Sequence, residues 1–471
     1  MAAHAPASAS GFDPELLRRY DRPGPRYTSY PTAPQFRTDF PLESLRARAL
    51  ESNAQLPARA LSLYVHIPFC ASPCFYCGCN RIITRDLVRG EHYVEQLLAE
   101  LNLVAPWFEA GRPVTQLHLG GGTPNFLSPR ALERLIRGIG ARLATSSADT
   151  RDFSVELDPR FVTEEHLAVL GALGFNRASL GVQDFAPEVQ QAIHRTQSIE
   201  QTLAAIESCR RYGLRSVNVD LIYGLPRQRP EGFARTLEAL RAARPERFAI
   251  YGYAHLPQNF KAQRRIRAGE LPDAAARLAL LGLAIETLTA RGYAHIGLDH
   301  FALPEDELAV ALKRGTLQRN FMGYTTHADC DLLALGVSAI SHIGSCFSQS
   351  LRELPAWERA LAARRVPLWR GLELDADDLL RAELIQQVMC RGAIDVRALE
   401  ERFGIEFEAY FASSLPRLAA LEADGLLVRD ARQLRATPAG RFLLRNIAMC
   451  FDRYLEAAPE AAAPKRYSQA L

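Results

Sequence analysis

The stretch Tyr64-Val-His-Ile-Pro-Phe-Cys70-Ala-Ser-Pro-Cys74-Phe-Tyr-Cys77-Gly-Cys79 places four of the chain's nine cysteines close together. Cys70, Cys74 and Cys77 follow the spacing C-x3-C-x2-C. Thiolates are soft ligands that select iron–sulfur clusters, zinc or copper(I). A 4Fe–4S cluster normally takes four protein thiolates, so three at this spacing would leave one iron open to a small molecule. The segment therefore predicts an iron–sulfur site whose open iron supports catalysis.

Two other uses of these cysteines are less favoured. A structural zinc site needs four ligands, usually in two separated pairs, and disulfides would imply an oxidising compartment. The other five cysteines are scattered along the chain at positions 209, 330, 346, 390 and 450, as expected for thiols of the core.

Length and composition indicate a protein of more than one domain. The chain has 471 residues, of which 48% are hydrophobic and 23% charged, and its formal net charge is +3. This balance is typical of globular proteins and gives no reason to expect a nucleic-acid partner. We find no run of eighteen apolar residues, and Met1–Ser10 lacks the basic start and apolar core of a secretory signal. We therefore expect a cytoplasmic protein without a membrane span.

Short apolar runs alternate with helical patterns between residues 60 and 300. The expected strands are Leu61–Ile67, Val114–Leu119, Phe153–Leu157, Arg177–Gly181, Ser216–Ile222 and Arg247–Tyr253. Expected helices include Arg130–Leu143, Ala274–Arg291 and one opened by a capping box at Ser198–Gln201. Strands and helices alternating in this way predict an α/β fold, a partial (β/α)6 barrel similar to a TIM barrel. Its ligand site should lie at the carboxyl ends of the strands.

The last hundred residues have a different pattern. Helices are expected over Asp377–Arg391, Asp395–Phe403 and Ser414–Ala423, followed by a hairpin and a further helix beginning at Thr437-Pro438. This pattern resembles a winged-helix domain. Acidic and basic residues are balanced in it, so a lid or docking role is favoured over DNA binding. We divide the chain into an arm (1–55), a barrel domain with an extension (56–365) and a helical C-terminal domain (366–471).

Several polar or glycine-rich motifs follow the expected strands. Gly120-Gly-Gly-Thr-Pro124 would let a ligand approach the backbone closely. Glu156 lies near the end of the third strand, with Asp158 just beyond it. Asp220 lies inside the fifth strand, where an unpaired charge is costly and a functional role is therefore favoured.

The cysteine spacing resembles the signature of the radical S-adenosylmethionine (SAM) superfamily. Nearly the whole chain is similar to the oxygen-independent coproporphyrinogen III oxidases of that superfamily. The similarity rests on five segments: Gly24–Thr32, Cys77–Asn80, Tyr251–Pro257, Gly323–Thr326 and Gly336–Ser341. One departure is His194, where the family commonly has Asn.

The resemblance implies roles for individual residues. Cys70, Cys74 and Cys77 would ligate one 4Fe–4S cluster. A first SAM on the open iron would contact Tyr64, Tyr76, Gly121, Glu156 and Ile340. A second SAM would contact Gly122, Thr123, Gln183, Arg195, Asp220 and Ala254. Cys79 is a candidate catalytic residue, and it could also be a fourth ligand in the absence of SAM, a relay or a structural thiol.

The implied reaction is the anaerobic oxidative decarboxylation of two propionates of coproporphyrinogen III to the vinyl groups of protoporphyrinogen IX, in heme biosynthesis. The implied partner is a reduced flavodoxin or ferredoxin, and the implied state is a monomer. Arginine forks suit the substrate carboxylates; the candidate cations are Arg22, Arg26, Lys261, Arg264, Arg265, Arg314 and Arg319. We also expect Arg22–Thr32 to fold over the barrel mouth.

Three other functions remain open. A heme chaperone on the same scaffold would bind heme without turnover; Cys79 and Gly24–Thr32 argue against it. A radical SAM enzyme that opens the heme ring would consume heme and release a linear tetrapyrrole. A DNA-binding regulator is the remotest alternative.

Overall fold

The computed structural model describes residues 12–55, 59–327 and 329–456, and the chain forms two compact units. One unit comprises Phe36–Pro272 and Asp329–Glu373, and we call it the barrel unit. The other comprises Met1–Gln35, Asp273–Ala328 and Leu374–Leu471, and we call it the terminal unit because it contains both ends of the chain. The division into residues 1–55, 56–365 and 366–471 follows the chain rather than these units and stays a prediction.

A row of parallel strands forms the centre of the barrel unit. In spatial order these neighbours are β1 (Leu61–Ile67), β4 (Val114–Gly121), β5 (Asp152–Leu157), β6 (Arg177–Gln183), β7 (Ser216–Tyr223) and β8 (Arg247–Gly252). They match the six expected strands to within two residues at every end. The α/β fold with a partial barrel is confirmed.

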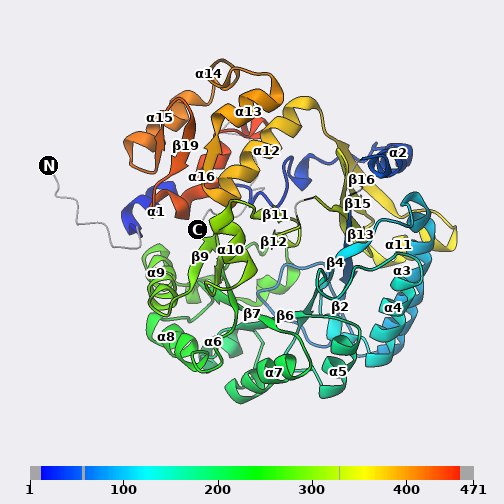
Figure 1. The fold of residues 1–471 in the computed structure, drawn as a ribbon. Helices are drawn as coiled ribbons and strands as arrows, with labels where there is room; N and C mark the ends of the chain where they lie inside the picture. Colours follow the sequence, from blue (N-terminus) through cyan, green and yellow to red (C-terminus); the bar gives the residue numbers. More distant parts are fainter. Residues whose placement is uncertain (1–11, 56–58, 328, 457–471) are drawn as a thin grey trace. The chain divides into compact units, whose positions relative to one another are not determined.

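Helices cover the outer side of these strands, as Figure 1 shows. They are α3 (Leu87–Val104), α4 (Pro129–Gly140), α5 (Glu164–Ala172), α6 (Pro187–Ala192), α7 (Ile199–Arg211) and α8 (Pro230–Ala239). Leu61, Leu63, Val65 and Ile67 of β1 are all fully buried. The alternate residues Ser62 and His66 are buried too, so both faces of β1 are covered, as is usual in a parallel sheet.

Side-chain caps begin several of these helices. Ser128 accepts a hydrogen bond from the Ala131 N–H at the start of α4, and that helix ends three residues earlier than expected. Ser198 likewise accepts from the Gln201 N–H at the start of α7. The expected capping box there is only half present, because the Gln201 amide donates to the Arg160 carbonyl instead.

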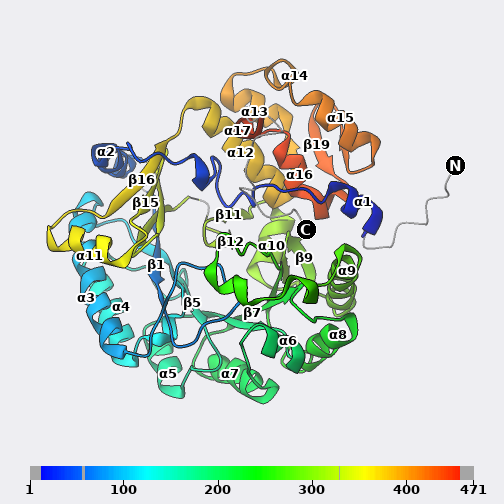
Figure 2. The same ribbon diagram turned by 180° about the vertical axis from the view of Figure 1, so that it is seen from behind.

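The sheet continues beyond β1 with strands that the sequence analysis did not find. These are β13 (Asp331–Leu335), which is parallel to β1, and the antiparallel strands β14 (Ile340–Ile343), β15 (Cys346–Ser350) and β16 (Leu368–Glu373). Figure 2 shows this extension beside α2 (Leu42–Asn53) and α11 (Leu354–Ala362). Since β14 runs back along β13, its first residue lies at the carboxyl edge of β1.

The C-terminal part of the terminal unit contains the expected helices. They are α12 (Ala376–Arg391), α13 (Val396–Phe403) and α15 (Leu415–Ala423), and a short α14 (Phe407–Tyr410) was not expected. The hairpin of β18 (Leu427–Arg429) and β19 (Gln433–Ala436) is joined by β17 (Ala393–Asp395).

The helix expected to begin at Thr437-Pro438 begins slightly later, at Gly440. Its first turn is a 3-10 helix, η6 (Gly440–Leu443), which leads directly into α16 (Leu444–Met449). Thr437 is held by the preceding turn: its N–H donates to the Leu426 carbonyl at 3.0 Å and its hydroxyl to the Gly425 carbonyl at 2.7 Å. Thr437 also caps the helical run as expected, because its hydroxyl oxygen accepts the Gly440 N–H at 3.1 Å and its carbonyl accepts the Arg441 N–H at 3.0 Å.

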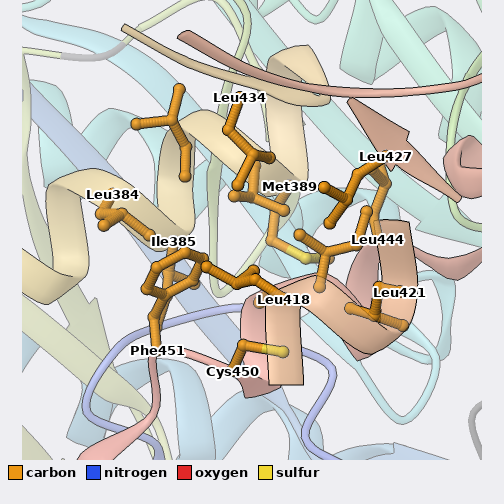
Figure 3. Packing of buried hydrophobic residues seen from close by; sticks show 14 of the residues in the cluster. Leu384, Ile385, Met389, Leu418, Leu421, Leu427, Leu434, Leu444, Cys450 and Phe451 are labelled. Carbon is orange, nitrogen blue, oxygen red and sulfur yellow. The ribbon is translucent and has the colours of Figure 1, made fainter. Parts of the chain in front are cut away.

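Buried apolar side chains from these helices and strands form the core of the terminal unit. Figure 3 shows Leu384, Ile385 and Met389 of α12 facing Leu418 and Phe451. The same core includes Leu17 of α1 (Pro14–Tyr20) and the rings of Tyr27 and Tyr30. Residues 12–35 of the N-terminal arm are therefore part of one core with the C-terminal helices, while the place of the arm over the barrel mouth stays a prediction.

Within the described ranges, no helix combines the length and apolarity needed to cross a bilayer.

Candidate active site

The cysteine-rich loop follows β1 and is held in shape by backbone pairing and one arginine. β2 (Phe69–Cys70) pairs with β3 (Ile82–Ile83), so the loop leaves and returns through a short ladder. Inside the loop, the Arg81 guanidinium donates to the carbonyls of Cys74 and Cys77, at 3.0 Å each. This clamp holds the three cysteines of the C-x3-C-x2-C motif in one compact turn.

Each of those three sulfur atoms receives at least one hydrogen bond. The Thr123 hydroxyl donates to Cys70 Sγ at 3.3 Å, and the Cys79 N–H donates to Cys77 Sγ at 3.4 Å. Cys74 Sγ accepts from two guanidinium groups, described below. None of these cysteines is in a disulfide. Hydrogen bonds and cations beside sulfur favour the thiolate, which is the form that binds metals.

Cys79 is exposed, unlike the buried Cys70 and Cys74. A hydrogen bond between the Cys77 and Cys79 side chains is the main cause that lowers the pKa of Cys77, to about 6, against the opposing effect of burial. Cys79 thus contacts a motif cysteine through both its backbone and its thiol. Which of the suggested roles Cys79 has stays a prediction.

The glycine triplet ends β4 beside this loop. Gly121 has φ +115°, a conformation that L side chains rarely adopt, and its N–H donates to Glu156 Oε2 at 3.0 Å. A Cβ on Gly122 would lie 2.7 Å from the carbonyl carbon of Pro68 and 2.9 Å from the Phe69 oxygen. Glycine is required at position 122 because its backbone is in contact with the backbone of Pro68 and Phe69.

Glu156 on β5 belongs to a row of polar side chains at the carboxyl edge. His118 Nε2 lies 3.4 Å from Glu156 Oε1, and the Tyr64 ring stacks on His118 with centroids 5.8 Å apart. The Tyr64 hydroxyl in turn lies 3.0 Å from His66 Nδ1. Burial alone would raise the pKa of Glu156, but the His118 ring and the Gly121 N–H outweigh it and hold that pKa below the usual range.

Asp158 links two arginines that both reach Cys74. Arg160 and Arg195 donate to Asp158 Oδ2 at 2.7 and 3.0 Å, and to Cys74 Sγ at 3.7 and 3.6 Å. The Asp158 carboxylate also accepts the Arg160 N–H at 3.1 Å, as expected for an aspartate that caps a turn. Burial raises the pKa of Asp158, yet the two guanidinium groups keep it below its usual value. Asp158, Arg160 and Arg195 therefore form a buried, ionised triad whose two guanidinium groups both contact Cys74 Sγ.

Asp220 and Gln183 lie on the next two strands. Asp220 on β7 accepts hydrogen bonds from the Ser179 hydroxyl at 2.9 Å and the Asn218 amide at 2.8 Å. Burial, together with the nearby Glu156, raises the pKa of Asp220 to about 6. Gln183 ends β6 with φ +69° and is buried.

The remaining predicted residues lie at the same edge of the sheet. The Tyr76 carbonyl, in the cysteine loop, accepts from the Gln263 amide at 2.8 Å. Ala254 follows the end of β8, and Ile340 begins β14. The structure therefore brings the predicted residues together at the carboxyl ends of the strands, within the barrel unit.

Comparison with known proteins identifies the family. Residues 64–240 match the Radical SAM superfamily, and residues 374–443 match the HemN C-terminal domain. Oxygen-independent coproporphyrinogen III oxidase of Pseudomonas aeruginosa is 47% identical, covering 94% of this chain and 96% of the relative. The Escherichia coli K12 protein of the same name is 45% identical over the same shares.

This chain belongs to the oxygen-independent coproporphyrinogen III oxidase family. A solved structure, described as coproporphyrinogen III oxidase (HemN) from Escherichia coli, a radical SAM enzyme, superposes with a TM-score of 0.88 and 44% identity. The match covers 94% of this chain and 99% of that one. It is the fold that the cysteine spacing and the strand pattern predicted.

Membership of the radical SAM superfamily implies a 4Fe–4S cluster and SAM, and the cysteine loop fits such a cluster. Among the residues the structure describes, no three His, Cys, Asp or Glu side chains converge on a single ion position. A cubane instead takes one thiolate at each of three separate irons. Burial raises the pKa of Cys70 to about 12, which penalises a bare thiolate but not one bonded to metal.

Four residues of this oxidase's site were missed by the sequence analysis: His66, His118, Arg81 and Arg160. The two histidines carried a usable signal, because each is a polar residue inside an apolar buried strand. The same signal, a polar residue inside a buried strand, singles out Asp220. The two arginines gave no such signal in the sequence, because each lies in a loop and its hydrogen-bond partners are known only from the folded structure.

Proposed function

We propose that this protein removes two propionate carboxyl groups of coproporphyrinogen III oxidatively and leaves the vinyl groups of protoporphyrinogen IX. One observation carries the proposal: three cysteines, each with a hydrogen-bond donor at its sulfur, lie beside the glycine triplet and Glu156. When bound, the cluster and SAM supply a 5′-deoxyadenosyl radical as the agent that takes hydrogen from the propionate. The rest of the reaction depends on binding and on excluding water.

Cys70, Cys74 and Cys77 are proposed to ligate the cluster, and Arg81 holds their loop closed through two carbonyls. Gly121 and Glu156 are proposed to bind the first SAM, together with Tyr64, Tyr76 and Ile340. The low pKa of Glu156 keeps it ionised at neutral pH, so that it accepts hydrogen bonds from a ribose or an ammonium group.

A second SAM is proposed to contact Gly122, Thr123, Gln183, Arg195, Asp220 and Ala254. Two of these side chains already have a hydrogen-bond partner within the protein: the Thr123 hydroxyl donates to Cys70 Sγ, and the Arg195 guanidinium donates to Asp158 Oδ2. The second molecule therefore rests on the family resemblance, and counting SAM per chain by equilibrium dialysis tests it.

Arg319, in β11 (Gln318–Asn320) of the terminal unit, is proposed as a cation for the substrate carboxylates. Its side chain is 9% exposed and lies over the Tyr324 ring at 4.7 Å. In the described part of the chain, its Nε and Nη1 atoms have no hydrogen-bond partner. A buried guanidinium in this state favours a carboxylate ligand. By contrast, Arg26 pairs with Asp299 at 3.2 Å.

The deciding experiment is anaerobic incubation of reconstituted protein with SAM, a reductant and coproporphyrinogen III. Vinyl product with methionine and 5′-deoxyadenosine is expected. Stoichiometric heme binding without turnover would favour the chaperone, and a linear tetrapyrrole from heme would favour ring opening. The matched variants Cys74→Ser and Cys79→Ser separate ligation from other roles, because only Cys74→Ser should lose bound iron.

Three further features belong to this proposal. The electron donor is a reduced flavodoxin or ferredoxin, the compartment is the cytoplasm, and the working form is a monomer. Light scattering of the reconstituted protein tests the last of these.

A further inference from the structure

The surface segment directly after the cysteine loop exposes apolar and basic side chains together. We call Ile83–Arg89 the 83–89 surface. Ile83 is 43% exposed, Leu87 55% and Val88 73%, and all three rank among the exposed large hydrophobic residues of the described chain. Three such residues within six positions exceed the scatter of single apolar side chains that is normal on a protein surface.

The charge of the 83–89 surface is positive. Arg85 and Arg89 are both exposed, and the Arg89 guanidinium lies over the Phe69 ring at 5.7 Å. Asp86 is the single acid in the segment, and its carboxylate is engaged as the helix cap that accepts the Val88 N–H at 3.0 Å. A protein that docks here would meet an apolar centre flanked by two arginines.

The backbone of this surface is bonded directly to that of a cluster ligand. In the β2–β3 ladder Cys70 is the partner of Ile83, and the Thr84 N–H donates to the Cys70 carbonyl at 3.0 Å. Phe69, under Arg89, is the neighbour of Cys70 in the chain. The surface is thus one hydrogen bond from the cysteine proposed to hold iron, a short path for an electron.

We propose that the 83–89 surface docks a small acidic one-electron carrier protein of the flavodoxin type. The inference rests on the proposed function, because radical SAM chemistry takes one electron from outside the chain for each SAM cleaved. On docking, the carrier loses one electron and the cluster held by Cys70, Cys74 and Cys77 gains it; no bond forms or breaks in this step. Charge complementarity with Arg85 and Arg89 would speed encounter and orient the carrier, and Leu87 and Val88 would exclude water.

The test compares the double variant Arg85→Glu/Arg89→Glu with the wild-type holoenzyme. Arg215→Glu is the matched control, since Arg215 is exposed and precedes β7 at the opposite, amino edge of the sheet. A second variant, Val88→Glu, changes the apolar centre without reversing a charge. Iron content and thermal melting are measured first for all of them.

Two readouts are used. Calorimetric titration with purified flavodoxin at low and high salt measures docking without turnover. Release of 5′-deoxyadenosine is then compared with reduced flavodoxin and with dithionite as the electron source. For the double variant we expect affinity for flavodoxin to fall about tenfold or more, a weaker salt dependence, and a matching loss of the flavodoxin-driven rate. The dithionite-driven rate should stay within about twofold of wild type, and Arg215→Glu should resemble wild type in every measurement.

Unchanged affinity and unchanged flavodoxin-driven rate in the double variant and in Val88→Glu would overturn the docking proposal. So would a concentration-dependent dimer of the wild type that the double variant abolishes, because the surface would then serve a second copy of the chain. If wild-type protein released no 5′-deoxyadenosine even with dithionite, the proposed function would fail. The titration would still decide docking on its own.

Discussion

At the scale of single residues, Cys74 has the most elaborate surroundings of the three cysteines proposed to ligate the cluster. Two guanidinium groups donate to its sulfur and share the Asp158 carboxylate behind it. Hydrogen bonds and positive charge beside a ligand sulfur stabilise the more negative, reduced state of an iron–sulfur cluster. The triad should therefore tune the reduction potential of the cluster rather than only shape the loop.

Replacing Arg160 with Met tests this tuning. The variant keeps the length of the side chain but removes one donor and one charge, so the reduction potential should fall by on the order of 60 mV, a tenfold effect for one electron. Redox titration followed by electron paramagnetic resonance measures the shift. Arg160→Lys, which restores the charge, should recover part of it; equal potentials in Met, Lys and wild type would contradict a tuning role.

At the scale of elements, the end of β4 packs backbone against backbone on the start of the cysteine loop. Gly122 donates its N–H to the Ile67 carbonyl at 2.7 Å while its α-carbon faces the backbone of Pro68 and Phe69. Backbone atoms cannot rotate away as side chains do. Any side chain at Gly122 must therefore displace the strand that carries Cys70.

Gly122→Ala should lower stability by about 1–3 kcal/mol and reduce the iron bound per chain after reconstitution. Thermal melting and iron analysis measure the two effects. Gly140→Ala is the control, because a Cβ on Gly140 at the end of α4 would meet nothing within 4 Å. Wild-type iron content in Gly122→Ala would show that the loop tolerates the shift.

The buried Glu100 makes stability depend on pH. This residue of α3 is 4% exposed and accepts the Gly336 N–H, which follows β13, at 2.7 Å. Burial is the main cause that raises the pKa of Glu100 to about 8 from 4.5. The folded state therefore binds a proton more tightly than the unfolded chain, and this stabilisation is complete below pH 4.5 and is lost as the pH rises through about 8.

Glu100→Gln should remove that dependence and leave the acceptor for the Gly336 N–H in place. Relative to wild type, the variant should gain stability between pH 5 and 9, by roughly a few kcal/mol in total at most. Urea unfolding across this range measures the difference. Glu95→Gln on the exposed side of α3 is the control, and parallel pH profiles of wild type and Glu100→Gln would contradict the assignment.

At the scale of the whole molecule, described segments near the two ends of the chain share one core within the terminal unit. The Tyr27 hydroxyl donates to Asp452 Oδ2 at 2.9 Å, and the Arg445 guanidinium donates to the Pro25 carbonyl at 3.0 Å. Asp452 is 2% exposed, so its carboxylate has no water to replace a lost donor. Residues 12–35 of the N-terminal arm are consequently a structural part of the terminal unit.

Tyr27→Phe should destabilise the terminal unit by about 1–3 kcal/mol, because it leaves a buried carboxylate oxygen without its donor. Urea unfolding and limited proteolysis of the arm measure the change. Tyr410→Phe removes a comparable bond, 2.7 Å to Asp377, at a 40% exposed site, and should cost under about 1 kcal/mol. Equal losses in both variants would show that burial of Asp452 is not what matters.

Most of the barrel could be read from the chain alone. Strands such as Leu61–Ile67 have an apolar residue at every second position, and the C-x3-C-x2-C spacing of the proposed cluster ligands is a local property that no distant contact alters. The placement of Glu156, Gln183 and Asp220 at one edge also followed, because parallel strands end together.

Only the tertiary structure shows which segments that are far apart in the chain come into contact. β13 was missed because its partner β1 lies far away in the chain; β14, β15 and β16 then continue the sheet as antiparallel neighbours of β13 and of one another. His66, His118, Arg81 and Arg160 acquired their partners in the same way. Local periodicity reports which face of a segment is buried, whereas the identity of the neighbour on that face is fixed only when the whole chain has packed.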